Sequence, residues 1–71
     1  MRYLVKKFKV FGKFDAEIWV DDKEEVAEKV VWTPRGISVQ PLSKRIAKRY
    51  IELLRSGKIK PLYESVTDLD L

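Results

Sequence analysis

Hydrophobic and polar residues alternate along the first third of the chain, which is typical of β-strands. Residues 3–11 alternate apolar side chains with Lys7 and Lys9, and residues 14–20 alternate apolar side chains with acids and a tryptophan. We predict that these two segments form strands joined into a hairpin at Gly12.

The length of this turn decides which residues share a face of the hairpin. A two-residue turn over 12–13 would place Lys7 and Lys9 among the apolar residues of the second strand. A three-residue loop over 12–14 avoids this and sets Lys9 opposite Glu17. Because a cross-strand charge pair contributes only about 0.2–1 kcal/mol, the hydrophobic sorting decides the register. The predicted apolar face consists of Leu4, Phe8, Val10, Ala16, Ile18 and Val20.

The acidic segment that follows supports two interpretations. Asp22 and Glu25 have the spacing of a helix capping pattern, which predicts a short helix over 23–29. The alternative is an acidic turn that leads into one strand from Glu25 to Trp32. The sequence leaves both open.

The next segment, Thr-Pro-Arg-Gly, predicts a tight turn. Pro34 suits its first central position, and Gly36 permits a positive φ. The turn joins strands 30–33 and 37–40 into a second hairpin, which Pro41 ends.

The stretch from Leu42 to Gly57 has a helical period, with apolar residues on one arc and charged residues on the other. Ser43 is a preferred N-cap, Gly57 suits the left-handed position after a helix, and Pro61 prevents continuation. We therefore predict a helix over 44–56. Its apolar arc consists of Leu42, Ile46, Ala47, Tyr50, Ile51, Leu53 and Leu54.

Together these elements predict a single small α+β domain over residues 1–71. A four-stranded, mainly antiparallel sheet of two hairpins carries a long C-terminal basic amphipathic helix on its apolar face. Pro61 is expected to open a one-turn helix through Val66, and residues 67–71 form a frayed acidic tail. A chain this short buries only about 60 % of the surface that its unfolded form exposes, so the predicted core is marginal.

The amino-acid composition excludes several kinds of functional site. The chain has no cysteine and no histidine, which excludes disulfides, thiolate metal sites and the commonest general base. Asparagine is absent, and 37% of the residues are charged, a pattern that predicts a thermophilic source. The apolar runs are too short for a membrane span or a signal peptide, so we expect a cytoplasmic protein.

The formal net charge of +4 arises from blocks of opposite sign. Residues 1–13 carry +5, residues 14–31 carry −5, residues 32–60 carry +7 and residues 61–71 carry −3. Such blocks either pair with each other in the fold or present separate faces to partners.

The basic arc of the predicted helix is the leading candidate site. Like charges repel along it at i,i+4, and two of them lie at the positive end of the helix dipole. A bound phosphate would reverse the sign of these interactions. The alternatives are an ordinary solvated face, or pairing with the acidic block from Asp15 to Glu28. The candidate residues are Lys44, Arg45, Lys48, Arg49 and Arg55.

The outer face of the first hairpin is the second candidate, because aromatics interleaved with lysines are what a sheet needs to stack bases and hold phosphates. Its candidates are Lys7, Lys9 and Trp19. The alternative is that these aromatics form a second core layer or a dimer contact. The predicted outer face consists of Tyr3, Val5, Lys7, Lys9, Phe11 and Trp19.

Three short segments and the helix that follows them resemble the small basic chromatin proteins of thermophilic archaea. The segments are Lys6-Lys7-Phe8-Lys9-Val10-Phe11-Gly12, Lys29-Val30-Val31-Trp32 and Gly36-Ile37-Ser38-Val39. The resemblance covers about half the chain and implies an archaeal source. It also implies sequence-independent binding of duplex DNA through a sheet, with Trp32 as the surface aromatic. The chain lacks that family's glycine-rich segment and the extra strand before the helix.

For catalysis the candidates are carboxylates, which could gather a divalent cation as in nucleases. They are Asp21, Asp22, Glu24 and Glu25. Their spacing matches no metal-binding loop, and no nucleophile with an adjacent base is present. We therefore expect a protein that is not an enzyme, with no metal, cofactor or small-molecule substrate.

The sequence therefore predicts a nucleic-acid-binding module that contacts phosphates through the basic face of its helix. The alternative is a protein-interaction or self-assembling domain, in which the basic helix meets an acidic protein partner or the acidic block of a second copy in a homodimer. An autoinhibited form is also open, with Asp68 and Asp70 covering the basic arc.

Overall fold

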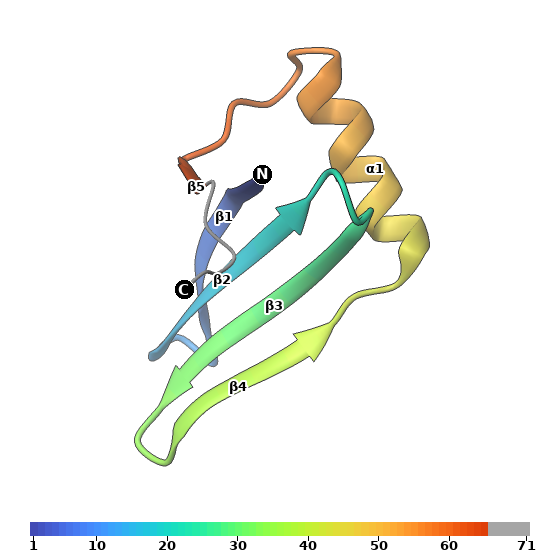
Figure 1. The fold of residues 1–71 in the computed structure, drawn as a ribbon. Coiled ribbons are helices and arrows are strands. Elements are labelled where there is room, and N and C mark those ends of the chain that lie inside the picture. The colour runs from blue at the N-terminus through green and yellow to red at the C-terminus, as the bar shows by residue number, and fades with distance from the viewer. Residues whose placement is uncertain (66–71) are drawn as a thin grey trace.

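A five-stranded antiparallel sheet and one helix make up residues 1–65, the part of the chain that the computed structural model describes (Figure 1). The strand order is β4-β3-β2-β1-β5, and every neighbouring pair is antiparallel. This confirms the α+β class and both predicted hairpins. The elements are β1 (Arg2–Val10), β2 (Phe14–Asp21), β3 (Val26–Thr33), β4 (Gly36–Pro41), α1 (Lys44–Arg55) and β5 (Tyr63–Ser65).

A tight turn joins β2 to β3, and the short helix predicted over 23–29 does not form. The carboxylate of Asp21 accepts the backbone N–H groups of Lys23 and Glu24, at 2.9 and 3.0 Å. Glu25 then adopts a left-handed conformation with φ 58°, which ends any helical path. The alternative interpretation, an acidic turn leading into one long strand, is the correct one.

The loop of the first hairpin starts one residue earlier than predicted and spans residues 11–13. Phe11 and Gly12 have positive φ values of 53° and 70°, the signature of a type I′ turn. As a result Lys9 lies opposite Asp15 rather than two residues further along β2. The observed register differs from the predicted one by two residues, and a difference of two leaves the side chains near the turn on their predicted faces.

A β-bulge in β1 changes the faces of three residues. Leu4 lies opposite Trp19 and Lys6 lies opposite Ile18, so Val5 is the extra residue between them. Val5 consequently packs against the core, and Tyr3 lies opposite Val20 on the same face, contrary to the predicted outer face that contains both. Leu4, which was predicted on the apolar face, lies on the other face of the sheet.

The predicted caps of α1 are confirmed. The Ser43 hydroxyl accepts the backbone N–H of Ile46 at 3.2 Å, and Gly57 has φ 76°. The N–H groups of Gly57 and Lys58 donate to the carbonyls of Leu54 and Leu53, a Schellman arrangement that ends the helix.

The chain continues past α1 into a fifth strand, so the predicted long C-terminal helix is wrong in that detail: α1 has 12 residues and is not the last element. The one-turn helix expected from Pro61 is also wrong. The N–H of Leu62 instead donates to the carbonyl of Leu4 at 2.7 Å, which directs β5 alongside β1. The tail predicted over 67–71 lies outside the described residues.

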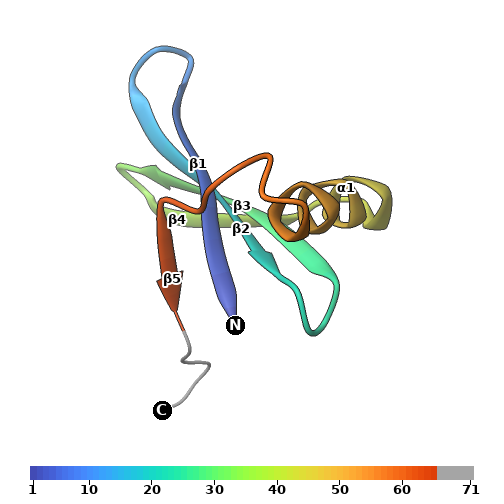
Figure 2. The ribbon, with the colours of Figure 1, turned by 90° about the horizontal axis from the view of Figure 1, so that it is seen from above.

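The core lies between α1 and one face of the sheet, beside the ends of β2 and β3 (Figure 1 and Figure 2). Ala47 on the helix and Val20 on β2 are both 0% exposed. The small alanine side chain lets the helix backbone approach the sheet closely. The packed residues are Ile18, Val20, Ala27, Ala47 and Ile51, with Val5, Phe8, Leu42, Tyr50 and Leu54 around them.

Candidate nucleic-acid interface

The cations of α1 lie around the exposed surface of the helix, and Lys48 and Arg55 line a pocket with Glu25 of the β2–β3 turn. All five candidate residues of the helix are exposed, and its first turn contains no acid. Within residues 1–65, α1 makes a single ion pair, between Arg49 and Glu52 of the same helix at 3.3 Å. An exposed ion pair of this kind contributes little to the stability of the folded state. The helix therefore presents four more positive than negative charges, from Lys44, Arg45, Lys48, Arg49 and Arg55 against Glu52.

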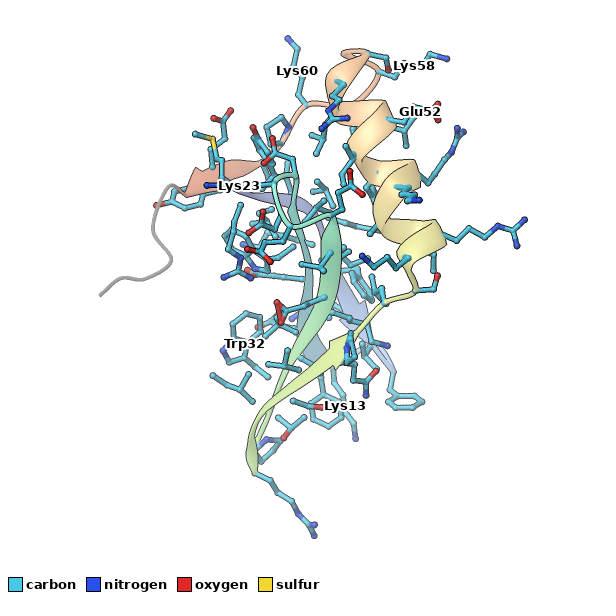
Figure 3. All side chains as sticks on the ribbon, turned by 45° about the vertical axis from the view of Figure 1, so that its right-hand side comes forward. Lys13, Lys23, Trp32, Glu52, Lys58 and Lys60 are labelled. Carbon is cyan, nitrogen blue, oxygen red and sulfur yellow. The ribbon has the colours of Figure 1, made fainter. Side chains whose placement is uncertain are left out.

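Two lysines extend this basic surface beyond the end of the helix. Lys58 and Lys60 lie near the C-terminal end of α1, and both are exposed (Figure 3). They lie outside the helical period, which stops at Gly57, so the helix pattern did not identify them. The two lysines lie two residues apart just after the predicted helix, and this spacing could have indicated that the basic surface continues past Gly57.

The acidic block is divided between two places. Asp15, Glu17 and Glu28 lie on the face of the sheet opposite α1, which we call the open face, whereas Glu25 of the β2–β3 turn lines a pocket with Lys48 and Arg55 of the helix. Among the described residues no ion pair joins this block to α1. The contacts are Asp15 with Lys9 at 2.7 Å, Glu17 with the Trp19 indole N–H at 2.9 Å, Asp22 with the Met1 amino group at 3.5 Å, and Glu28 with Arg2 at 3.6 Å.

The two groups of candidate residues lie on opposite sides of the molecule. Lys7, Lys9 and Trp19 project from the open face, away from the cations of α1. Lys7 lies opposite Glu17, and the ammonium of Lys9 is paired with Asp15. The hydrogen bond and positive charge of Lys9 lower the pKa of the Asp15 carboxyl. The lysines of the open face are thus matched by acids.

Trp19 is enclosed by its neighbours. Its N–H donates to Glu17, the Arg2 guanidinium lies 5.1 Å from its ring centre, and the ring of Tyr63 approaches edge-on at 6.1 Å. A base could stack on Trp19 only by displacing one of these groups.

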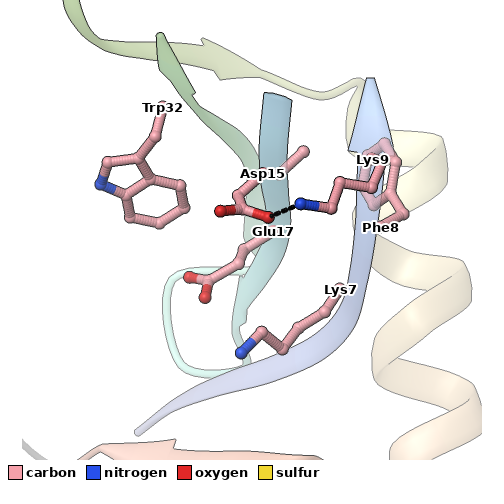
Figure 4. Close-up of a pocket in the computed structure, with 7 residues that line it drawn as sticks. Lys7, Phe8, Lys9, Asp15, Glu17 and Trp32 are labelled. Atoms are coloured by element: carbon pink, nitrogen blue, oxygen red, sulfur yellow. Dashed lines mark ion pairs between the residues drawn. The ribbon is translucent and has the colours of Figure 1, made fainter. Parts of the chain in front are cut away.

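Trp32 is the more exposed tryptophan of the open face, at 39%. It borders a shallow open pocket of about 580 Å³ whose other side carries the Lys9–Asp15 ion pair, with Lys7 and Glu17 next to it (Figure 4). The pocket walls carry both signs of charge, so the open face lacks the one-sided charge of α1.

The four candidate metal-binding carboxylates do not converge. Asp21 is occupied by the two backbone N–H groups of its turn, and Asp22 lies near Tyr3 and the Met1 amino group. In the described part of the chain no three acidic side chains come close enough together to hold a metal ion. Over residues 1–65, no helix has the length and apolar character needed to cross a membrane.

Comparison with known proteins finds no relative of this chain. No protein-family model matches the chain, and neither the curated proteins nor the solved structures contain a match. The function of this chain is therefore inferred from the geometry of the site.

Proposed function

We propose that this protein is a non-enzymatic nucleic-acid-binding module that holds backbone phosphates on the basic surface of α1. The observation that supports it best is the exposure of the helix cations: none of them forms an ion pair with the acidic block within residues 1–65, although Glu25 lies beside Lys48 and Arg55. Five like charges on one short helix oppose each other until an anion approaches.

The dimensions of the helix fit a few phosphates. A helix of 12 residues is about 18 Å long, and a duplex carries one charge per roughly 1.7 Å of its axis. Three to five cations of α1 can then reach phosphates of one backbone. Counterion release gives a slope of about −0.9 in log affinity against log salt for each phosphate, so we expect a total slope of roughly −3 to −5.

The open face competes for the same role, because the resemblance to archaeal chromatin proteins implies binding through a sheet tryptophan. Trp32 is exposed there, but Asp15 and Glu17 lie beside it and oppose a phosphate. We therefore assign the contact to α1. A self-assembling domain built on complementary charged faces has less support, since the acidic block already has contacts within its own chain.

Matched double variants separate the two faces. Fluorescently labelled duplex DNA, single-stranded DNA and RNA are titrated at 50 and 200 mM salt with the unmodified protein, Lys44→Gln/Lys48→Gln, Lys7→Gln/Lys9→Gln and Trp32→Ala. Both double variants remove the same charge. Losing two phosphate contacts weakens binding roughly 10- to 100-fold, so this loss is expected for the helix variant alone.

Two outcomes would contradict the proposal. Absence of binding to all three nucleic acids at 50 mM salt would leave an acidic protein as the partner of α1. A loss confined to Trp32→Ala and the hairpin variant would move the interface to the open face. Circular dichroism of each variant establishes that the fold is retained.

A further inference from the structure

The two edge strands of the sheet differ in how well they are protected against pairing with a strand of another molecule. At one edge the short strand β5 covers only the start of β1, and the rest of β1 carries a bulge and exposed lysines. Bulges, short strands and lysines are the usual devices against strand pairing between molecules. At the other edge, β4 has no charged residue and every residue is exposed. Ile37 and Val39 are 62% and 53% exposed.

Within residues 1–65, one side of the β4 backbone has no hydrogen-bonding partner. Gly36 closes the turn opposite Thr33, and at the far end the N–H of Leu42 donates to the carbonyl of Ala27 at 2.9 Å. Hydrogen-bonded positions alternate along an antiparallel pair, so the even-numbered residues of β4 bond to β3. The N–H and C=O groups of Ile37 and Val39 therefore point away from the sheet.

We propose that a second copy of this chain pairs with β4 in antiparallel orientation, centred on Ser38. In this register Ile37 of each copy exchanges main-chain hydrogen bonds with Val39 of the other. Ser38 meets Ser38 of the second copy across the two-fold axis as a non-hydrogen-bonded pair.

The side chains on both faces fit this register. On the open face Ile37 of one copy lies beside Val39 of the second, which continues the apolar strip formed with their β3 neighbours Trp32 and Val30. On the helix face the facing residues are uncharged, because Ser38 meets Ser38 and Gly36 lies opposite Gln40.

Charge also favours a second copy as the occupant. The register sets Arg35 opposite Pro41 of the second copy, and Glu28 of that copy lies one strand further along the same face. The basic helices lie at opposite ends of the strand pair, roughly 20 Å apart, which exceeds a Debye length of about 8 Å at physiological salt.

The pair of six-residue strands is small compared with the roughly 1,200–2,000 Å² that stable interfaces bury. We therefore expect a weak dimer that is populated at high protein concentration. Because the two-fold axis is perpendicular to the sheet, both copies of α1 lie on the same side of the joined sheet. This last consequence rests on the proposed function: a duplex contacted by both helices would strengthen the dimer through bivalency.

Cysteine cross-linking tests the register directly, since the chain contains no cysteine. Facing Cβ atoms of a non-hydrogen-bonded antiparallel pair lie about 4.5–5.5 Å apart and those of a disulfide about 3.5–4.5 Å, so Ser38→Cys needs only a small adjustment to form a disulfide across the axis. Gln40→Cys is the control, because it is exposed on the same strand and face but lies opposite Gly36 of the second copy. Mild oxidation without nucleic acid is expected to cross-link Ser38→Cys at least tenfold faster than Gln40→Cys. Equal rates would overturn the proposed register.

Sedimentation of the unmodified chain tests the dimer itself. The apparent mass is expected to rise from 8.4 kDa toward twice that value as the concentration increases to the millimolar range. Val39→Lys places a charge at the edge and is expected to abolish the rise, whereas Val26→Lys, an exposed valine of the same face away from the edge, preserves it. A strict monomer at every concentration would overturn the proposal. Because these measurements contain no nucleic acid, their failure leaves the binding test of α1 unaffected.

Discussion

The two faces of the sheet show two ways in which one set of strands can be organised. On the face under α1, Val20 and Ile18 of β2 are buried, and the helix supplies the covering layer. The open face has no covering helix among the described residues, and Leu4 is buried there between the paired residues Trp19 and Tyr63. Its side chains are instead held by local pairs, such as Lys9 with Asp15 and Trp19 with Arg2.

This difference explains where the positive charge remains available. Carboxylates on the open face neutralise the lysines and arginine beside them, so that face has no single sign. The covered face buries apolar area, and the cations of its helix remain exposed. The sheet thus separates Asp15, Glu17 and Glu28 from the helix cations, whereas Glu25 of the β2–β3 turn lies beside Lys48 and Arg55.

The largest expected effect comes from the two isoleucines of α1, because one is buried under the helix and the other is not. Ile51 is 4% exposed, whereas Ile46 is 42% exposed. Ile51→Ala is expected to lower the free energy of unfolding by about 2–4 kcal/mol, since it opens a cavity against the sheet. Ile46→Ala is expected to cost less than about 1 kcal/mol. Urea denaturation of both variants measures the difference.

Equal losses for the two isoleucines would show that α1 lies on the sheet in a different orientation. Ile51 would then not mark the side of α1 that faces the sheet, and the exposed position of the helix cations would no longer follow.

The two tryptophans give the next largest effect and probe the open face alone. Trp19 contacts Arg2, Glu17 and Tyr63, whereas Trp32 is 39% exposed. Because Trp19 is only partly buried, Trp19→Ala is expected to cost about 1.5–2.5 kcal/mol, below the range for a fully buried tryptophan. Trp32→Ala is expected to cost less than about 1 kcal/mol. Thermal unfolding followed by circular dichroism distinguishes them, and a larger loss at Trp32 would contradict the local-pair description.

Much of the fold follows from sequence patterns, because turn chemistry and caps act locally. Ser43 and Gly57 mark the bounds of α1, and the proline-glycine turn marks the second hairpin. The bulge at Val5 escaped prediction because one extra residue reverses the alternation without a signal of its own. The strand β5 escaped because three residues show no periodicity, and its position depends on pairing with a distant strand.

The candidate site was predictable only in part. The exposed cations of α1 follow from the helical period. The enclosure of Trp19 does not, because it depends on Arg2 and Tyr63, which are distant from it in sequence. The charge blocks were visible, but which acids face which bases depends on the register. In the first hairpin the observed register differs from the predicted one by two residues, so the partner of Lys9 is Asp15 and not Glu17.

The smallest expected effect concerns that ion pair and its dependence on pH. The hydrogen bond from Lys9 lowers the pKa of Asp15, so the pair stabilises the folded state at pH values above the unfolded pKa of about 3.9. As the pH falls below about 4, Asp15 becomes protonated and this contribution disappears. The thermal midpoint of Asp15→Asn should therefore lie slightly below that of the unmodified protein at pH 7 and coincide with it near pH 2. Added salt should narrow the gap at pH 7, because the pair is exposed. A gap that persisted unchanged to pH 2 would show that Asp15 acts through backbone or turn geometry, and the open face would then owe less to paired charges than its contacts indicate.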